Sequence, residues 1–388
     1  MSDVLAQFAD RDPARYFSIL QVGRARVHGT APTEHWVLAR GGHWPNSHWA
    51  PLLLLWTRCD STLAQLDDSN RSCLLRPPQR MRFDRIAGDV AHNTAALAID
   101  GRVLGVGGMY RERRVGMRAA ARGILAFEAR TEAQLRSWAS PGGSARVVVR
   151  GNASGCIERR IAFVRSGGCE FDGRLSLAVR SDGTHFLYAR ANMHPQGGAR
   201  HVQVTSGPSL ATLGPFRALR IGRYRVEQQH NIYFASVKAN PADGGQSLVG
   251  LFPVAVAPPP ATNRQTDAAS TDARAPSQDA YLGLAISCDG VHFSPMVRLA
   301  ASELSHDAAR TVDHPADGWS VEGDVVHYYL HRDVPGIWAA GERGPTPTRR
   351  SRLVRRTLAL SWLRSLTRNA TSCEGGLVGC DRTARACT

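Results

Sequence analysis

Four segments of this chain begin with a small polar residue and continue directly into an alternating apolar strand. The polar residues are Asn93, Asp172, Asn231 and Asp317. They are separated by 79, 59 and 86 residues, and the last step falls to 64 when the 22-residue segment Pro258–Asp279 is left out. Strand-only repeats of this period are typical of a radial architecture. In such a fold, the first residue of each repeat can line one shared pocket near the central axis.

A second pattern recurs at a matching distance from these positions. A strand, a polar turn and then an aromatic residue occur around Phe127–Thr131, Val202–Ser206 and Leu284–Ser287. The offsets are 38, 34 and 56 residues, and the last falls to 34 without the insert. A weaker copy lies at 52–66, and the last repeat continues towards 355–360. Together these patterns predict an all-β fold, a five-bladed β-propeller, because ring closure removes exposed sheet edges.

Composition separates the predicted propeller from its flanks. The propeller is expected over residues 16–340, with an N-terminal segment at 1–15 and a basic C-terminal tail at 341–388. Helix is expected in the first fifteen residues and in Leu353–Leu366. The insert Pro258–Asp279 is rich in Pro, Ala, Ser and Thr and has no aromatic residue. It cannot build a core, so we expect a disordered loop.

Charge and cysteine content restrict the partners. The net charge is +15, from 48 Lys and Arg against 33 Asp and Glu, and Lys238 is the single lysine. The basic residues are scattered except in Arg349–Arg356, which favours a solvated surface over nucleic-acid binding. The eight cysteines are too few for a disulfide scaffold. Five of them show no paired metal spacing, and the three in the tail, which lack a nearby fourth ligand, are interpreted as incidental.

The ends of the chain give only a default location. The N-terminus lacks the basic start and apolar run of a signal peptide. The longest apolar stretch, Pro51–Trp56, is too short to span a bilayer. We therefore expect no membrane partner, a cytoplasmic location by default, and a monomer.

Several motifs between residues 80 and 340 resemble those of a known family. The segments EFDGRLSL, FLYARAN, NIYFASVKANP and RTVDHPADG are similar to five-bladed β-propeller glycoside hydrolases, the group of arabinanases, invertases and levansucrases. The resemblance is closer to uncharacterised members of that group. It implies a carbohydrate ligand and the hydrolysis or transfer of glycosidic bonds. These enzymes place three acids at the inner ends of three blades, because bond cleavage needs one carboxyl group to protonate the leaving oxygen and another to attack or activate water.

Two carboxylates are the candidate catalytic residues. The repeat and the resemblance both select Asp172, and the repeat alone selects Asp317. The equivalent positions Asn93 and Asn231 carry amides, which cannot act as nucleophile or acid. These amides motivate a second hypothesis, a glycan-binding propeller without catalysis. A third hypothesis, a propeller that binds protein or nucleic acid, would use the basic surface.

Other polar side chains are candidates for ligand binding. His92 and His230 each precede a strand-start asparagine, and His314 lies close to Asp317. A metal ion held by these histidines is the less favoured alternative, and no cofactor is expected. Asp89, Glu170, Glu227 and Asp313 could replace a missing acid, although a turn role is favoured for each. Trp319 and Trp338 could stack on a sugar or pack between blades, and Arg200 suits the same pocket. The candidate substrate-binding residues are Asn93, Asn231, His92, His230, Asp313, His314, Arg190 and Asn192.

Overall fold

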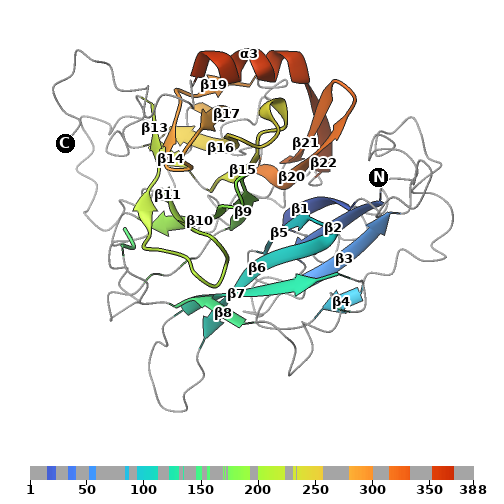
Figure 1. Cartoon of the computed structure of the whole chain (residues 1–388), viewed down its shortest axis with the longest axis vertical. Helices are drawn as coiled ribbons and strands as arrows, with labels where there is room; N and C mark the ends of the chain where they lie inside the picture. The colour runs from blue at the N-terminus through green and yellow to red at the C-terminus, as the bar shows by residue number, and fades with distance from the viewer. Residues whose placement is uncertain are drawn as a thin grey trace, which may run out of the picture.

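Over the residues that it describes, the computed structural model is an all-β protein with a propeller-like arrangement of sheets, a 3-10 helix at Pro241–Asp243 and one longer α-helix near the C-terminal end (Figure 1). It describes only part of the chain. The described residues are 15–22, 34–40, 52–57, 84–86, 94–111, 122–130, 134, 146–150, 155–157, 169, 171, 174–192, 200–222, 230–232, 234–256, 279–299, 314–332 and 352–370. The insert at 258–279 lies outside them except for Asp279, which begins a strand.

Three sheets correspond directly to the predicted repeats. The first contains β5 (Ala95–Ile99), β6 (Arg102–Arg111), β7 (Arg122–Ala129) and β8 (Arg146–Val149). The second contains β9 (Ser176–Val179), β10 (His185–Asn192), β11 (Arg200–Gly207) and β12 (Arg217–Ala218). The third contains β14 (His230–Ile232), β15 (Ser236–Ala239), β16 (Leu248–Val256), β17 (Asp279–Ser287) and β19 (Val297–Arg298).

The recurring strand–turn–aromatic pattern lies on the third strand along the chain in the first two sheets. In the third sheet it lies on β17, which follows β14, β15 and β16. It falls on β7, β11 and β17, so the equivalence inferred from the offsets is confirmed. A separate short pair joins β13 (Arg220–Ile221) to β18 (His292–Phe293) in parallel.

The number of large sheets differs from the five blades that the sequence predicted. The described strands form four large sheets, because a single parallel pairing, Ser18 with Asp317, joins two sets of strands into one seven-stranded sheet. The order in this sheet is β22–β21–β20–β1–β2–β3–β4. Its strands are β1 (Arg15–Val22), β2 (Glu34–Arg40), β3 (Leu52–Thr57), β4 (Asp84–Ile86), β20 (His314–Glu322), β21 (Val325–Arg332) and β22 (Arg352–Ala359).

Part of the expected tail belongs to this sheet. β22 pairs with β21 along its whole length, from Val325 with Ala359 to Arg332 with Arg352. The helix expected over Leu353–Leu366 instead begins at Leu360, as α3 (Leu360–Ala370). Leu360 and Leu363 of α3 are buried against the third sheet and β21. This helix is far too short to cross a membrane, and no helix in the described part of the chain could do so.

Five strands, β1, β5, β9, β15 and β20, surround the middle of the molecule, and we call them the first strands. β1 lies beside β5, β5 beside β9, β9 beside β15, β15 beside β20, and β20 beside β1. Figure 1 shows these five strands together near the centre of the view. Residues at the beginnings of different repeats are therefore brought close to one another.

Neighbouring sheets pack face to face, which explains the nearly continuous apolar strands. Along β16, Leu248 and Phe252 face the second sheet, whereas Val249 and Leu251 face β21 and α3. Alternate residues of a strand point to opposite faces, so a strand buried on both sides must be apolar throughout. Gly250 of the same strand lies under the Phe252 ring, and a Cβ there would lie 2.5 Å from its Cζ atom.

A buried histidine makes the fold sensitive to acid. His201 Nε2 donates a hydrogen bond to the Leu219 carbonyl oxygen over 2.7 Å. Burial lowers the pKa of His201, and the bond to Leu219 opposes this only in part. The unfolded chain takes up this proton near pH 6.5, whereas the native state takes it up at lower pH. Stability should therefore fall as the pH drops from about 6.5 to the native pKa, by up to about 1.4 kcal/mol per pH unit.

Replacing His201 should reduce this dependence. We expect His201→Gln to show a smaller loss of unfolding free energy between pH 7 and pH 5 in urea titrations. His185→Gln, at a partly exposed histidine of β10, should retain the wild-type loss. Equal pH dependence in His201→Gln and the wild type would contradict the assignment.

Candidate functional site

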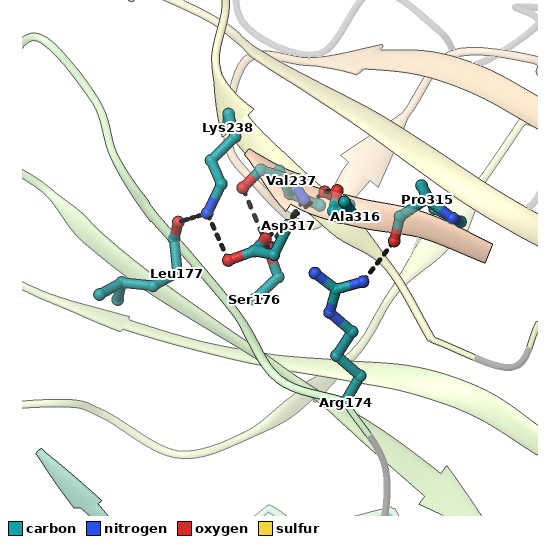
Figure 2. Close-up of polar contacts among 9 residues, drawn as sticks. Arg174, Ser176, Leu177, Val237, Lys238, Pro315, Ala316 and Asp317 are labelled. Atoms are coloured by element: carbon teal, nitrogen blue, oxygen red, sulfur yellow. Dashed lines mark hydrogen bonds and ion pairs between the residues drawn. The ribbon is translucent and has the colours of Figure 1, made fainter. Parts of the chain in front are cut away.

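A buried ion pair lies where the first strands meet. Lys238 Nζ of β15 is 2.8 Å from Asp317 Oδ2 of β20, and their side chains are 4% and 0% exposed. The ammonium group also donates to the Leu177 carbonyl oxygen of β9 over 2.6 Å. Figure 2 shows these contacts among the three strands. Lys238 therefore connects three first strands through one ammonium group.

Two serine hydroxyls complete the surroundings of the carboxylate. The Ser176 hydroxyl lies 2.7 Å and the Ser236 hydroxyl 3.4 Å from Asp317 Oδ1. Ser176 Oγ also accepts the Val237 amide proton over 2.9 Å. A carboxylate that is bonded on both oxygens can remain buried without water. We call Ser176, Ser236, Lys238 and Asp317 the central cluster.

The opposite charges of Lys238 and Asp317 compensate each other in this cluster. Burial lowers the pKa of Lys238, while the charge of Asp317 and the hydrogen bond to it raise that pKa. The nearby Arg174 guanidinium lowers it further. Each charge is thus tolerated in the interior because the other is present.

A second layer of side chains lies beside the central cluster. The Arg174 guanidinium donates to the Pro315 carbonyl oxygen (Figure 2) and lies over the Phe234 ring, 5.3 Å from its centroid. The His314 ring meets the same Phe234 ring edge-on, with centroids 5.3 Å apart. All three side chains are buried. We call Arg174, Phe234 and His314 the aromatic layer. Its residues lie just before β9, just before β15 and at the start of β20.

The position of Asp317 differs from the one expected. The carboxylate was predicted to be a catalytic group at the start of a repeat, but it is fully buried and bonded to Lys238. It contacts Ser176 and Ser236, the first residues of β9 and β15. Both oxygens of the carboxylate are occupied, by the Lys238 ammonium group and by the two serine hydroxyls. The catalytic role expected for Asp317 stays a prediction.

The reason is a difference in register. Asp317 contacts Ser176, and Pro315 contacts Arg174. Both pairs are separated by 141 residues. The residue with the same separation from Asp172 is Asp313. β20 also carries a register shift between Pro315 and Trp319, and Gly318 has a φ of 117°, so the spacing of polar residues in the sequence does not give this alignment.

The other predicted site residues fall into three groups. His314 is in the aromatic layer, whereas Arg190 is buried on β10, where its backbone carbonyl oxygen accepts a bond from Gln203. Trp319 packs against the apolar core between β21 and the third sheet, as its packing alternative predicted. For Asn192, His230 and Asn231 the structure describes the strand but not the side chain, and it describes none of His92, Asn93, Asp172 and Asp313.

Within the described residues there is no group of three or more His, Cys, Asp or Glu side chains that could hold a metal ion. The motif analysis missed Lys238, Ser176, Ser236, Arg174 and Phe234. One signal was available for Lys238, since it is the single lysine among 48 cationic residues. The serines gave no comparable signal, because small residues are common at strand starts.

Two of the cysteines that show no paired metal spacing are joined. Cys156 and Cys169 form a disulfide, and Cys288 is also disulfide-bonded.

Comparison with known proteins finds similar solved structures at low sequence identity. No family model and no curated protein sequence matches it. A solved N-acetylgalactosamine deacetylase from F. plautii, in complex with blood group B trisaccharide, is 10% identical with a TM-score of 0.47 over 91% of each chain. The Penicillium chrysogenum α-L-arabinanase complexed with arabinobiose is 10% identical, with a TM-score of 0.42 over 89% of this chain and 94% of that one.

The GH93 α-L-arabinofuranosidase of Fusarium graminearum, also in complex with arabinobiose, is 9% identical with a TM-score of 0.40, over 90% and 94% of the two chains. TM-scores below 0.5 do not establish a shared activity for this chain.

Proposed function

We propose that this protein is a carbohydrate-active propeller whose ligand binds where the chain enters β9, β15 and β20. The observation that carries the proposal is the contact of Arg174, Phe234 and His314 in the aromatic layer. These residues come from three different repeats, and each lies within three positions of a predicted site residue. We call positions 172, 231 and 313 the strand-start positions. A pocket built from them would draw on three repeats at once.

The chemistry proposed for this pocket is cleavage or transfer at a glycosidic bond. Such a reaction uses two carboxyl groups on either side of the bond. Asp172 remains the first candidate for one of them. The separation of 141 residues that Arg174 and Ser176 keep from their partners on β20 suggests Asp313, just before β20, as a further candidate acid beside Asp172. The sequence resemblance to propeller glycoside hydrolases supports the same class of substrate.

A glycan-binding protein without catalysis is the second candidate function. The amides at Asn93 and Asn231 favour it, because they replace carboxylates at two repeat starts. Amides and aromatic rings bind sugar hydroxyls and faces well, yet they cannot transfer the protons that hydrolysis requires. The two functions share a ligand and differ only in turnover.

The experiment that separates them uses the full oxidised chain. Purified protein is applied to an array of plant, fungal and bacterial glycans, and the glycans retained are then incubated with it and analysed for released reducing ends. Binding with release supports the glycosidase, and binding without release supports the second function. Retention of no glycan, together with no hydrolysis of soluble polysaccharides, would reject both.

A further inference from the structure

The fold buries the only lysine of the chain. Lys238 is the single lysine among 48 cationic side chains, and the rest are arginines. A guanidinium group keeps its proton in proteins and does not react as an amine, whereas a lysine becomes a nucleophile once its ammonium group loses a proton. Side-chain amine chemistry in this protein is therefore restricted to one atom, Lys238 Nζ, and that side chain is 4% exposed.

In the folded state this nitrogen is bonded to two acceptors. Lys238 Nζ donates to Asp317 Oδ2 over 2.8 Å and to the Leu177 carbonyl oxygen over 2.6 Å. Figure 2 shows the ammonium group between these two acceptors. A protonated nitrogen has no lone pair with which to attack a carbonyl carbon, and the side chain is too deeply buried for a reagent to reach it. We therefore expect the folded protein to be inert towards amine-directed reagents.

Local fraying would not expose Lys238, because the residue lies between strands of several repeats. Its backbone pairs with Val249 of β16, and β15 also contacts β9 and β20. The neighbouring Val237 has no exposed surface. Core strands of this kind open with a free energy close to that of global unfolding, unlike termini and surface loops. The amine should therefore become accessible only when the sheets separate.

Acylation of the unfolded chain would remove the charge that the central cluster needs. An acyl group turns the ammonium group into a neutral amide. The Asp317 carboxylate, which is 0% exposed, would then return to the interior with its hydroxyl partners but without the positive charge of Lys238. A charge buried without its partner is strongly destabilising, and a close-packed interior leaves little space for the added group. A chain acylated at Lys238 should therefore fail to regain the fold.

We propose that Lys238 is an acylation site that folding makes inaccessible, so that acyl thioesters modify only unfolded chains and thereby keep them unfolded. In this step the ammonium group first gives one proton to solvent. The neutral Nζ then attacks the thioester carbonyl carbon and an amide C–N bond forms. The C–S bond breaks, and the sulfur leaves as a thiol with a second proton from the nitrogen. The modification would mark chains that have lost the fold or never reached it, and it does not depend on the proposed carbohydrate ligand.

The first test measures how fast Lys238 reacts in the full oxidised chain. N-hydroxysuccinimide acetate is the acyl donor, an unstructured peptide with one lysine is the reference in the same tube, and acetylation is followed by peptide mass spectrometry. Without urea, Lys238 should react at least about 10³-fold more slowly than the reference, as expected for a site that opens only by global unfolding. Its rate should rise with urea in proportion to the unfolded fraction measured by fluorescence. A native rate within about 10-fold of the reference, or a rate that does not follow unfolding, would overturn the inference.

The second test reverses the order of two steps. In one arm the chain is unfolded in urea with its disulfides intact, treated with the same reagent and then dialysed. In the other arm the folded chain is treated first, the reagent is quenched, and the chain is then unfolded and dialysed. Hydroxylamine removes acetyl esters from hydroxyl groups in both arms and leaves the amide on Lys238.

Recovery of the native circular dichroism and tryptophan fluorescence is compared between the arms. We expect it to fall at least about 10-fold in the chains treated while unfolded, and to match that of untreated protein in the chains treated while folded. Equal recovery in the two arms would overturn the inference, as would native spectra from chains that mass spectrometry shows to be acetylated at Lys238.

Discussion

Lys238→Met is expected to destabilise the protein by about 3–5 kcal/mol, which is the usual cost of breaking a buried ion pair from one side. The Asp317 carboxylate would stay fully buried and keep only hydroxyl partners. It would also lose the ammonium group that joins β9, β15 and β20. Urea unfolding followed by tryptophan fluorescence measures the change. Arg364→Met on the exposed face of α3 is the matched control and should change stability by less than about 0.5 kcal/mol.

The double variant Lys238→Met/Asp317→Asn provides the stronger test. Asparagine removes the uncompensated charge while its amide oxygen can still accept from Ser176 and Ser236. The double variant should therefore be more stable than Lys238→Met alone, because the large penalty comes from an isolated buried charge rather than from the loss of a favourable pair. A Lys238→Met protein that unfolds at the wild-type urea concentration would show that the ion pair is not formed in solution.

Asp172→Asn is expected to have the largest effect on function. If the protein cleaves glycans, loss of this carboxylate should lower turnover by about 10²- to 10⁴-fold, the range for a group that transfers a proton in the transition state. The amide is nearly the same size, so the melting temperature should stay close to that of the wild type. If the protein only binds glycans, the readout is a weaker affinity measured by calorimetry.

The matched control is Asp182→Asn, in the hairpin at the other end of β9. Arg180 holds the pKa of this carboxyl well below its usual range, chiefly through a hydrogen bond. The pair is partly exposed, with side chains 25% and 47% accessible, so its loss should cost little stability and leave glycan turnover unchanged. Equal activity in Asp172→Asn and Asp182→Asn would remove Asp172 from the site.

Local patterns in the sequence were sufficient for the strands and their order. The alternation of apolar residues and the repeated strand–turn–aromatic unit predicted β7, β11 and β17 as equivalent strands, because side-chain period and turn chemistry depend only on near neighbours. They also predicted that the chain after 325 would continue the last sheet as far as 360. The helix was displaced, since β22 pairs with β21 before α3 begins.

The site itself was decided by contacts between distant parts of the chain. Asp317 lies at the start of a repeat in the sequence, yet its side chain is fully buried and paired with Lys238, 79 residues away in the chain. The single pairing of Ser18 with Asp317 changes the number of sheets, and nothing near Cys156 in the sequence indicates Cys169 as its partner. The sequence alone predicted a chain built of strands and the equivalence of β7, β11 and β17. The tertiary structure alone decided which strands meet, because register and burial arise from pairings between strands far apart in the chain.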